Sequence, residues 1–173
     1  KGNITIENST IMTKDGINLY PYANHYARLY NNTIEVNETA IYIATYTPVY
    51  IIHCHIMNSD YGIAVQHEDN TLYIEYTEIF SKETAILYSQ DSCELIIEHS
   101  TLIAKTGIGG ATSGSTITIR DTHIETQWNL SAIGISGDYN SIVIENAYLT
   151  ACVETSGLYN YLEIINTTFM EGY

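Results

Sequence analysis

The chain has 173 residues, 45% of them hydrophobic, and a formal net charge of −14 from 20 acidic and only six basic side chains. Such a charge repels nucleic acids and anionic membrane surfaces, so we expect neither as a partner, and it disfavours acidic polysaccharides unless divalent cations bridge the two surfaces. No apolar run approaches the roughly 18 residues of a membrane-spanning helix. The three cysteines do not suggest a disulfide framework.

A repeat with a period of roughly 22 or 23 residues runs along the chain. Its copies are residues 4–11, 27–34, 49–56, 72–79, 95–102, 117–124, 142–149 and 162–169. Each copy begins with two apolar residues at alternate positions, the period of a strand with one buried face, and ends on a second apolar anchor. Most are followed by a small residue and an aliphatic one, such as Gly62-Ile63. The pattern predicts three short strands per coil, with the small residue easing a bend.

Equivalent residues stacked about 4.8 Å apart would form columns of Ile, Leu and Val that no single coil could bury. The sequence therefore predicts an all-β fold, a single-stranded parallel β-helix of about seven to eight coils that forms one domain over residues 1–173. Neither end shows a capping helix or a polar covering segment, and open strand edges invite pairing. We expect a fragment of a longer solenoid or multidomain chain, in which more chain or a neighbouring subunit continues the stack.

One polar or aromatic column follows the first strand of each coil. It consists of Asn8, Asn31, His53, Tyr76, His99, Asp121, Asn146 and Asn166. Its parity predicts side chains that point inward, where stacked amides hydrogen-bond along the axis and His99 bonds Asp121. The column resembles the asparagine ladder of right-handed parallel β-helices, and the coil pattern is similar to that of the pectin-lyase-like superfamily. The resemblance covers essentially the whole chain and implies a right-handed solenoid.

The resemblance also implies that a saccharide cleft, if there is one, lies on the outer face of the first strands. Tyr50 and Tyr73 occupy adjacent coils of that face, followed by Ile96, with Tyr30 and Ile52 in the next outward column. Outward aromatic residues of this kind stack on sugar rings, pack against another chain, or have no function. We take Tyr30, Tyr50 and Tyr73 as candidate ligand-binding residues.

Glutamates accompany these tyrosines. Glu75 and Glu98 are one coil apart, about 4.8 Å between backbones, where they could share a proton or a cation. Arg120 is placed between Glu98 and Glu145, which favours a solvated charge ladder on an exposed sheet. Glu75 and Glu98 complete the candidate ligand-binding set, with the ladder as the favoured interpretation.

Acidic residues also gather in two loops that close neighbouring coils. Glu68, Asp69 and Asp91 could supply several of the about six to eight oxygens that calcium takes. Asp, Asn and Ser are also the usual turn-forming residues, which favours the interpretation without a metal. The run His53-Cys54-His55 does not predict a zinc site, because a bend is expected between its two histidines.

The superfamily resemblance implies polysaccharide lyase or glycoside hydrolase as the enzymatic alternative. Lyases of this fold need calcium-holding acids near a basic residue, and hydrolases need clustered aspartates. Here Arg120 is flanked by two glutamates and no aspartate pair occurs, so we assign no catalytic residue. The sequence favours a secreted or cell-surface β-helix acting in adhesion, in carbohydrate binding or as a structural shaft, with polysaccharides or another protein chain as partners.

Overall fold

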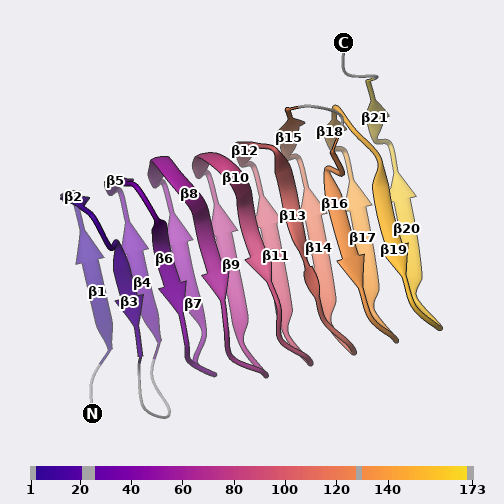
Figure 1. Ribbon diagram of the computed structural model, residues 1–173, viewed down its shortest axis with the longest axis horizontal. Helices are drawn as coiled ribbons and strands as arrows, with labels where there is room; N and C mark the ends of the chain where they lie inside the picture. The colour runs from indigo at the N-terminus through magenta and orange to yellow at the C-terminus, as the bar shows by residue number, and fades with distance from the viewer. Residues whose placement is uncertain (1–2, 21–25, 128–129, 171–173) are drawn as a thin grey trace.

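The strands of each coil lie beside those of the next coil along the whole length of the molecule (Figure 1). The computed structural model describes residues 3–20, 26–127 and 130–170, which form an all-strand parallel solenoid of about seven turns. Every strand pair is parallel, and these residues contain no helix. Accordingly, the described part of the chain has no helix that could span a membrane. The predicted fold class is confirmed.

The first strand of each coil belongs to one sheet of eight strands. In spatial order they are β1 (Ile4–Glu7), β4 (Ala27–Tyr30), β7 (Val49–Ile52), β9 (Thr71–Glu75), β11 (Glu94–Glu98), β14 (Thr116–Arg120), β17 (Ser141–Glu145) and β20 (Tyr161–Ile165). Leu72 pairs with Leu95, and Leu95 with Ile117, so equivalent residues of the repeat are direct neighbours. Buried and half-buried residues alternate along β9 and β11, as the predicted period of two requires.

The second and third segments of the coils form a second sheet of 13 strands. Second segments are β2 (Thr10–Thr13), β5 (Thr33–Val36), β12 (Thr101–Ala104), β15 (His123–Thr126), β18 (Tyr148–Leu149) and β21 (Thr168–Phe169). Third segments are β3 (Ile17–Leu19), β6 (Thr39–Ile43), β13 (Thr106–Ala111), β16 (Ile133–Ser136) and β19 (Val153–Ser156). In two coils both segments merge into one strand of 11 residues, β8 (His55–Val65) and β10 (Glu78–Tyr88). Register shifts around Ser81 bend these merged strands, so the predicted division into three strands holds only in the other coils.

Stacked aliphatic columns fill the interior. The column from the middle of the first strands consists of Leu29, Ile51, Ile74, Ile97, Ile119 and Ile144, all at most 1% exposed. Burial of one such side chain contributes about 1.5–3 kcal/mol. Small residues sit where neighbouring coils approach most closely: a Cβ added at Gly62 would lie 2.4 Å from Cγ2 of Ile79 and 2.6 Å from the carbonyl oxygen of Ala85. Close packing, and not the dihedral angles of a bend, explains this glycine.

The predicted inward column points outward. All eight of its residues have a left-handed backbone with φ between 47° and 53°, and all are exposed, Tyr76 to 48%. A single left-handed residue changes the direction of the chain, so the residue that follows it faces the core. The inward prediction is therefore wrong by one position for this column, Tyr76 included.

A ladder of small residues, most of them polar, occupies the inward position instead. It consists of Ser9, Asn32, Cys54, Thr77, Ser100, Thr122, Ala147 and Thr167. The backbone N–H of Thr77 donates to Oγ of Ser100 at 3.1 Å, and that of Ser100 to Oγ1 of Thr122 at 3.4 Å. Each of these hydroxyls in turn donates to the carbonyl two residues before it, as Ser100 does to Glu98 at 2.8 Å. Hydroxyl groups thus fill the role predicted for amides, because one hydroxyl can accept and donate at once.

Candidate functional site

A groove of about 300 Å³ runs over the outer face of β7, β9 and β11. It is lined by Tyr50, Ile52, Tyr73, Ile74, Glu75, Ile96 and Glu98. The backbone register places Tyr50, Tyr73 and Ile96 side by side, and Ile52, Glu75 and Glu98 in the next outward column. Four of the five predicted ligand-binding residues therefore line one groove.

Two parallel tyrosine rings form one wall of the groove. The rings of Tyr50 and Tyr73 are 4.9 Å apart between centroids and 5° from coplanar orientation, and Tyr26 packs edge-on against Tyr50 at 6.1 Å. The column continues with Ile96, whose side chain is shorter than a tyrosine. The side chains of this column therefore extend less far from the sheet after Tyr73, which leaves an apolar corner between the Tyr73 ring and Ile96.

Carboxylates flank this corner. Glu98 accepts a hydrogen bond from Nη1 of Arg120 at 3.0 Å, and Glu145 accepts one from Nε of Arg120 at 3.3 Å. These hydrogen bonds, the one donated to Glu98 first, raise the pKa of the Arg120 guanidinium. Glu75 pairs in register with Glu98 but has no ion-pair or side-chain hydrogen-bond partner in the described part of the chain. The predicted charge ladder is present over Glu98, Arg120 and Glu145.

Glu94 is a further acidic residue at this face, which the sequence reasoning missed. It is half-buried at the start of β11, two residues before Ile96 and on the same side of the strand. Burial, and then the negative charge of Glu94, raise the pKa of the Tyr73 phenol. Tyr73 is therefore protonated at neutral pH, and its hydroxyl can donate as well as accept a hydrogen bond. The alternation of outward residues along β11 was the signal that could have found Glu94.

Tyr30 lies beside the groove, not in its lining. The guanidinium of Arg28 is 4.8 Å from the centre of the Tyr30 ring, and His53 packs edge-on against that ring at 5.6 Å. His53 begins an exposed stack along the bend, with centroids 5.0 Å from His53 to Tyr76 and 4.9 Å from Tyr76 to His99. The groove is thus bordered by a second row of aromatic side chains.

His99 and Asp121 are neighbours, but on the surface. Nδ1 of His99 lies 3.8 Å from Oδ2 of Asp121, which is too long for a hydrogen bond. The predicted interior hydrogen bond is therefore wrong in its place and its geometry, although the two side chains do meet.

The acidic loops are organised as turns. Asp69 donates its backbone N–H to the carbonyl oxygen of Asp91 at 3.3 Å, and Oδ1 of Asp91 accepts the N–H of Ser113 at 2.7 Å. No three or more His, Cys, Asp or Glu residues of the described ranges are grouped so that they could hold a metal ion. The structure therefore does not gather Glu68, Asp69 and Asp91 into a calcium site, and calcium binding stays a prediction.

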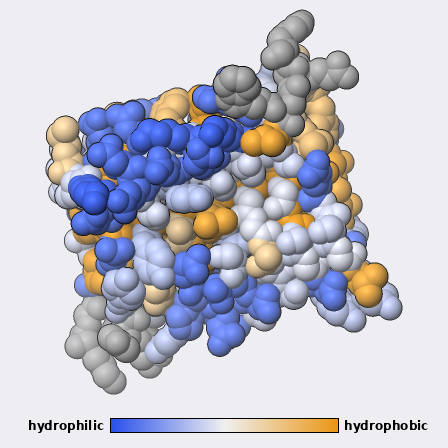
Figure 2. Space-filling model, viewed as in Figure 1, coloured by the Kyte–Doolittle hydropathy of each residue, from blue (hydrophilic) through white to orange (hydrophobic). Residues whose placement is uncertain are grey.

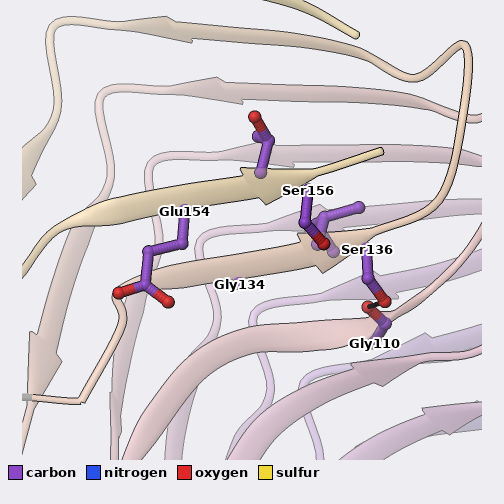
Figure 3. Close-up of a pocket in the computed structure, with 7 residues that line it drawn as sticks. Gly110, Gly134, Ser136, Glu154 and Ser156 are labelled. Atoms are coloured by element: carbon purple, nitrogen blue, oxygen red, sulfur yellow. Dashed lines mark hydrogen bonds between the residues drawn. The ribbon is translucent and has the colours of Figure 1, made fainter. Parts of the chain in front are cut away.

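A second, shallow depression of about 440 Å³ lies over β13, β16 and β19 (Figure 3). Its lining consists of Gly110, Gly134, Ile135, Ser136, Glu154, Thr155 and Ser156. Oγ of Ser136 donates to the carbonyl oxygen of Gly110 at 3.4 Å, while the Glu154 carboxylate lies at the opposite side of the depression (Figure 3). Glu154 is the one acid in this lining, and its Oε1 accepts a hydrogen bond at 3.2 Å from Sγ of Cys152, a residue outside the lining.

Comparison with known proteins gave one match. The family model of the right-handed β-helix region matches residues 1–148. Searches of curated proteins and of solved structures found no match. The matched region covers most of the chain and coincides with the stacked parallel coils described above. The chain belongs to the right-handed β-helix family.

Proposed function

We propose that this chain is a non-catalytic, carbohydrate-binding β-helix of the extracellular space or cell surface, and that the groove over β7, β9 and β11 holds the glycan. The observation that carries the proposal is the parallel pair Tyr50 and Tyr73, which ends in an open corner at Ile96. Aromatic side chains supply rigid apolar surface for the C–H faces of sugar rings. Glu75, Glu98 and the Tyr73 hydroxyl are placed to hydrogen-bond sugar hydroxyls around that surface.

The position of Arg120 supports a binding role over the enzymatic alternative. A polysaccharide lyase needs a base that removes a proton from the sugar, and a hydrolase needs a carboxyl pair free to act on the glycosidic bond. Arg120 is held between Glu98 and Glu145, and the raised pKa of its guanidinium makes it a poorer proton acceptor. Glu98 is occupied by the same ion pair, so the register neighbours Glu75 and Glu98 are not both free to act on a glycosidic bond.

A structural shaft is the second candidate, and the continuous stack of coils favours it. The first strands pair in parallel register from β1 to β20 without interruption, so the coils form one continuous solenoid. Adhesion combines the two roles, with a stiff shaft that presents a glycan-binding face.

A glycan array, probed with and without calcium, tests the proposal. We expect binding to neutral or basic glycans that Tyr73→Ala abolishes. Tyr139→Ala, which removes an exposed and stacked tyrosine remote from the groove, is the matched control and should bind like the parent chain. A reducing-sugar assay on every bound glycan should detect no product. Release of product would support the enzymatic alternative instead. If no glycan bound, the structural shaft would be the remaining candidate function.

A further inference from the structure

The basic side chains of the described residues are all engaged with carboxylates. The pairs are Lys14 with Glu38 at 3.4 Å, Arg28 with Glu7 at 3.7 Å, Lys82 with Asp60 at 3.4 Å, Lys105 with Glu83 at 2.6 Å, and Arg120 with Glu98 at 3.0 Å. The lysine pairs belong to the bends between second and third strands, where a band of hydrophilic residues crosses the upper part of Figure 2. A polyanionic ligand would have to break such pairs to find a cation.

The groove, in contrast, carries acidic side chains that have no basic partner among the described residues. Glu75 and Glu94 lie on either side of the corner formed by Tyr73 and Ile96, Glu75 on β9 and Glu94 on β11. Both side chains are half-buried, and neither has an ion-pair or side-chain hydrogen-bond partner within the residues that the structure describes. An apolar wall is therefore bordered by two carboxylates that no protein cation neutralises.

We infer that the ligand of this groove is an amino-sugar polymer that carries free ammonium groups. The inference rests on the proposed function and specifies the chemical class of the glycan that the groove binds. The apolar face of one sugar packs in the corner between Tyr73 and Ile96, and its ammonium group donates charge-assisted hydrogen bonds to Glu75 or Glu94. The net charge of −14 attracts such a polycation from a distance and repels polyuronates.

The experiment measures affinity calorimetrically for three oligosaccharides of equal length: fully deacetylated glucosamine oligomers, the same oligomers fully N-acetylated, and oligogalacturonate. We expect the deacetylated oligomer to bind about tenfold more tightly than its acetylated counterpart, and oligogalacturonate not to bind. Glu75→Gln and Glu94→Gln should each weaken binding of the deacetylated oligomer by about twofold to fivefold, because exposed ion pairs contribute modestly. Each variant should weaken binding of the deacetylated oligomer by a larger factor than binding of the acetylated oligomer, because only the deacetylated oligomer carries ammonium groups.

Glu125→Gln is the matched control, since it removes one exposed carboxylate from β15, outside the groove-bearing sheet. If Glu125→Gln weakened binding as much as Glu75→Gln, attraction by net charge alone would account for the result and the inference would be overturned. Equal affinity for the acetylated and deacetylated oligomers would also overturn it, while leaving the proposed function intact. Tyr73→Ala tests the proposed glycan binding separately from the preference for ammonium groups, because it should abolish binding of both glucosamine oligomers. If no oligomer bound to the parent chain, the proposed function itself would be contradicted.

Discussion

Thr77 joins Cys54 and Ser100, one in the preceding coil and one in the following coil, through its buried hydroxyl and its backbone N–H. Its Oγ1 accepts the backbone N–H of Cys54 in the preceding coil at 3.2 Å and donates to the carbonyl of Glu75 at 2.9 Å, while its own N–H donates to Oγ of Ser100 in the following coil at 3.1 Å. The bonds from Cys54 to Thr77 and from Thr77 to Ser100 are buried, so each of them replaces a lost bond to solvent.

Thr77→Val should therefore destabilise the protein although it preserves the shape of the side chain. The substitution leaves the N–H of Cys54 buried without an acceptor, which costs about 1–3 kcal/mol. Urea unfolding followed by circular dichroism measures the difference. Thr77→Ser keeps the hydroxyl and should recover most of the loss; a valine variant as stable as the parent would contradict the role of this ladder.

Tyr50 and Tyr73 should stabilise each other. From their parallel contact at 4.9 Å we expect a coupling energy of about 0.5–1.5 kcal/mol in a double-mutant cycle of Tyr50→Ala and Tyr73→Ala. The free energy of unfolding of the two single variants and the double variant gives this value. Additive effects would mean that the stack is only a consequence of strand register.

The three thiols should differ in reactivity. Burial, the leading cause, raises the pKa of Cys54 and of Cys93, whereas Cys152 is exposed; none of them is in a disulfide. Because the thiolate is the reactive form, iodoacetamide at neutral pH should modify Cys152 alone in the native protein and all three cysteines after unfolding. Mass spectrometry counts the adducts. Modification of Cys54 in the native state would show that the coils open locally.

Glu154 should titrate below the usual range of glutamate. Hydrogen bonds from Ser131, the larger cause, and from Cys152 lower the pKa of its carboxyl from the ordinary value of 4.5. A lowered pKa in the folded state contributes stability above the ordinary value, and this contribution is lost as the pH falls through the folded-state pKa. Carboxyl-carbon NMR titration measures the midpoint. Ser131→Ala should move it back towards the ordinary value, and an unchanged midpoint would contradict the assigned cause.

Strand parity explains why most of the groove could be predicted. Once the repeat is aligned, Tyr50, Tyr73, Glu75 and Glu98 must share one outer face, because the parallel strands pair at the repeat spacing. The step from Tyr73 to Ile96 could not be derived in the same way, since it depends on how far side chains of different length extend from neighbouring coils.

The inward column was misplaced for a different reason. Parity continues only while the backbone stays extended, and the left-handed residue after each first strand interrupts it. Asparagine tolerates that conformation well, but His53, Tyr76 and His99 adopt it too. The residue types at these coils therefore did not indicate a left-handed backbone. The acidic loops show a similar ambiguity, because Asp91 caps a turn with the same oxygen that could have served a metal.

The hydroxyl ladder makes coil number an adjustable quantity. Thr77 and Ser100 are 23 residues apart. The hydroxyl of each accepts a backbone N–H from the preceding coil, and the N–H of each donates to a hydroxyl of the following coil. A tandem duplication of 23 codons would therefore insert a whole turn that fits between its neighbours without a new cap, lengthening the solenoid by about 4.8 Å. If the inserted turn copies β9, it also adds another tyrosine and glutamate to the groove, so the solenoid and the groove would lengthen together, one whole coil at a time.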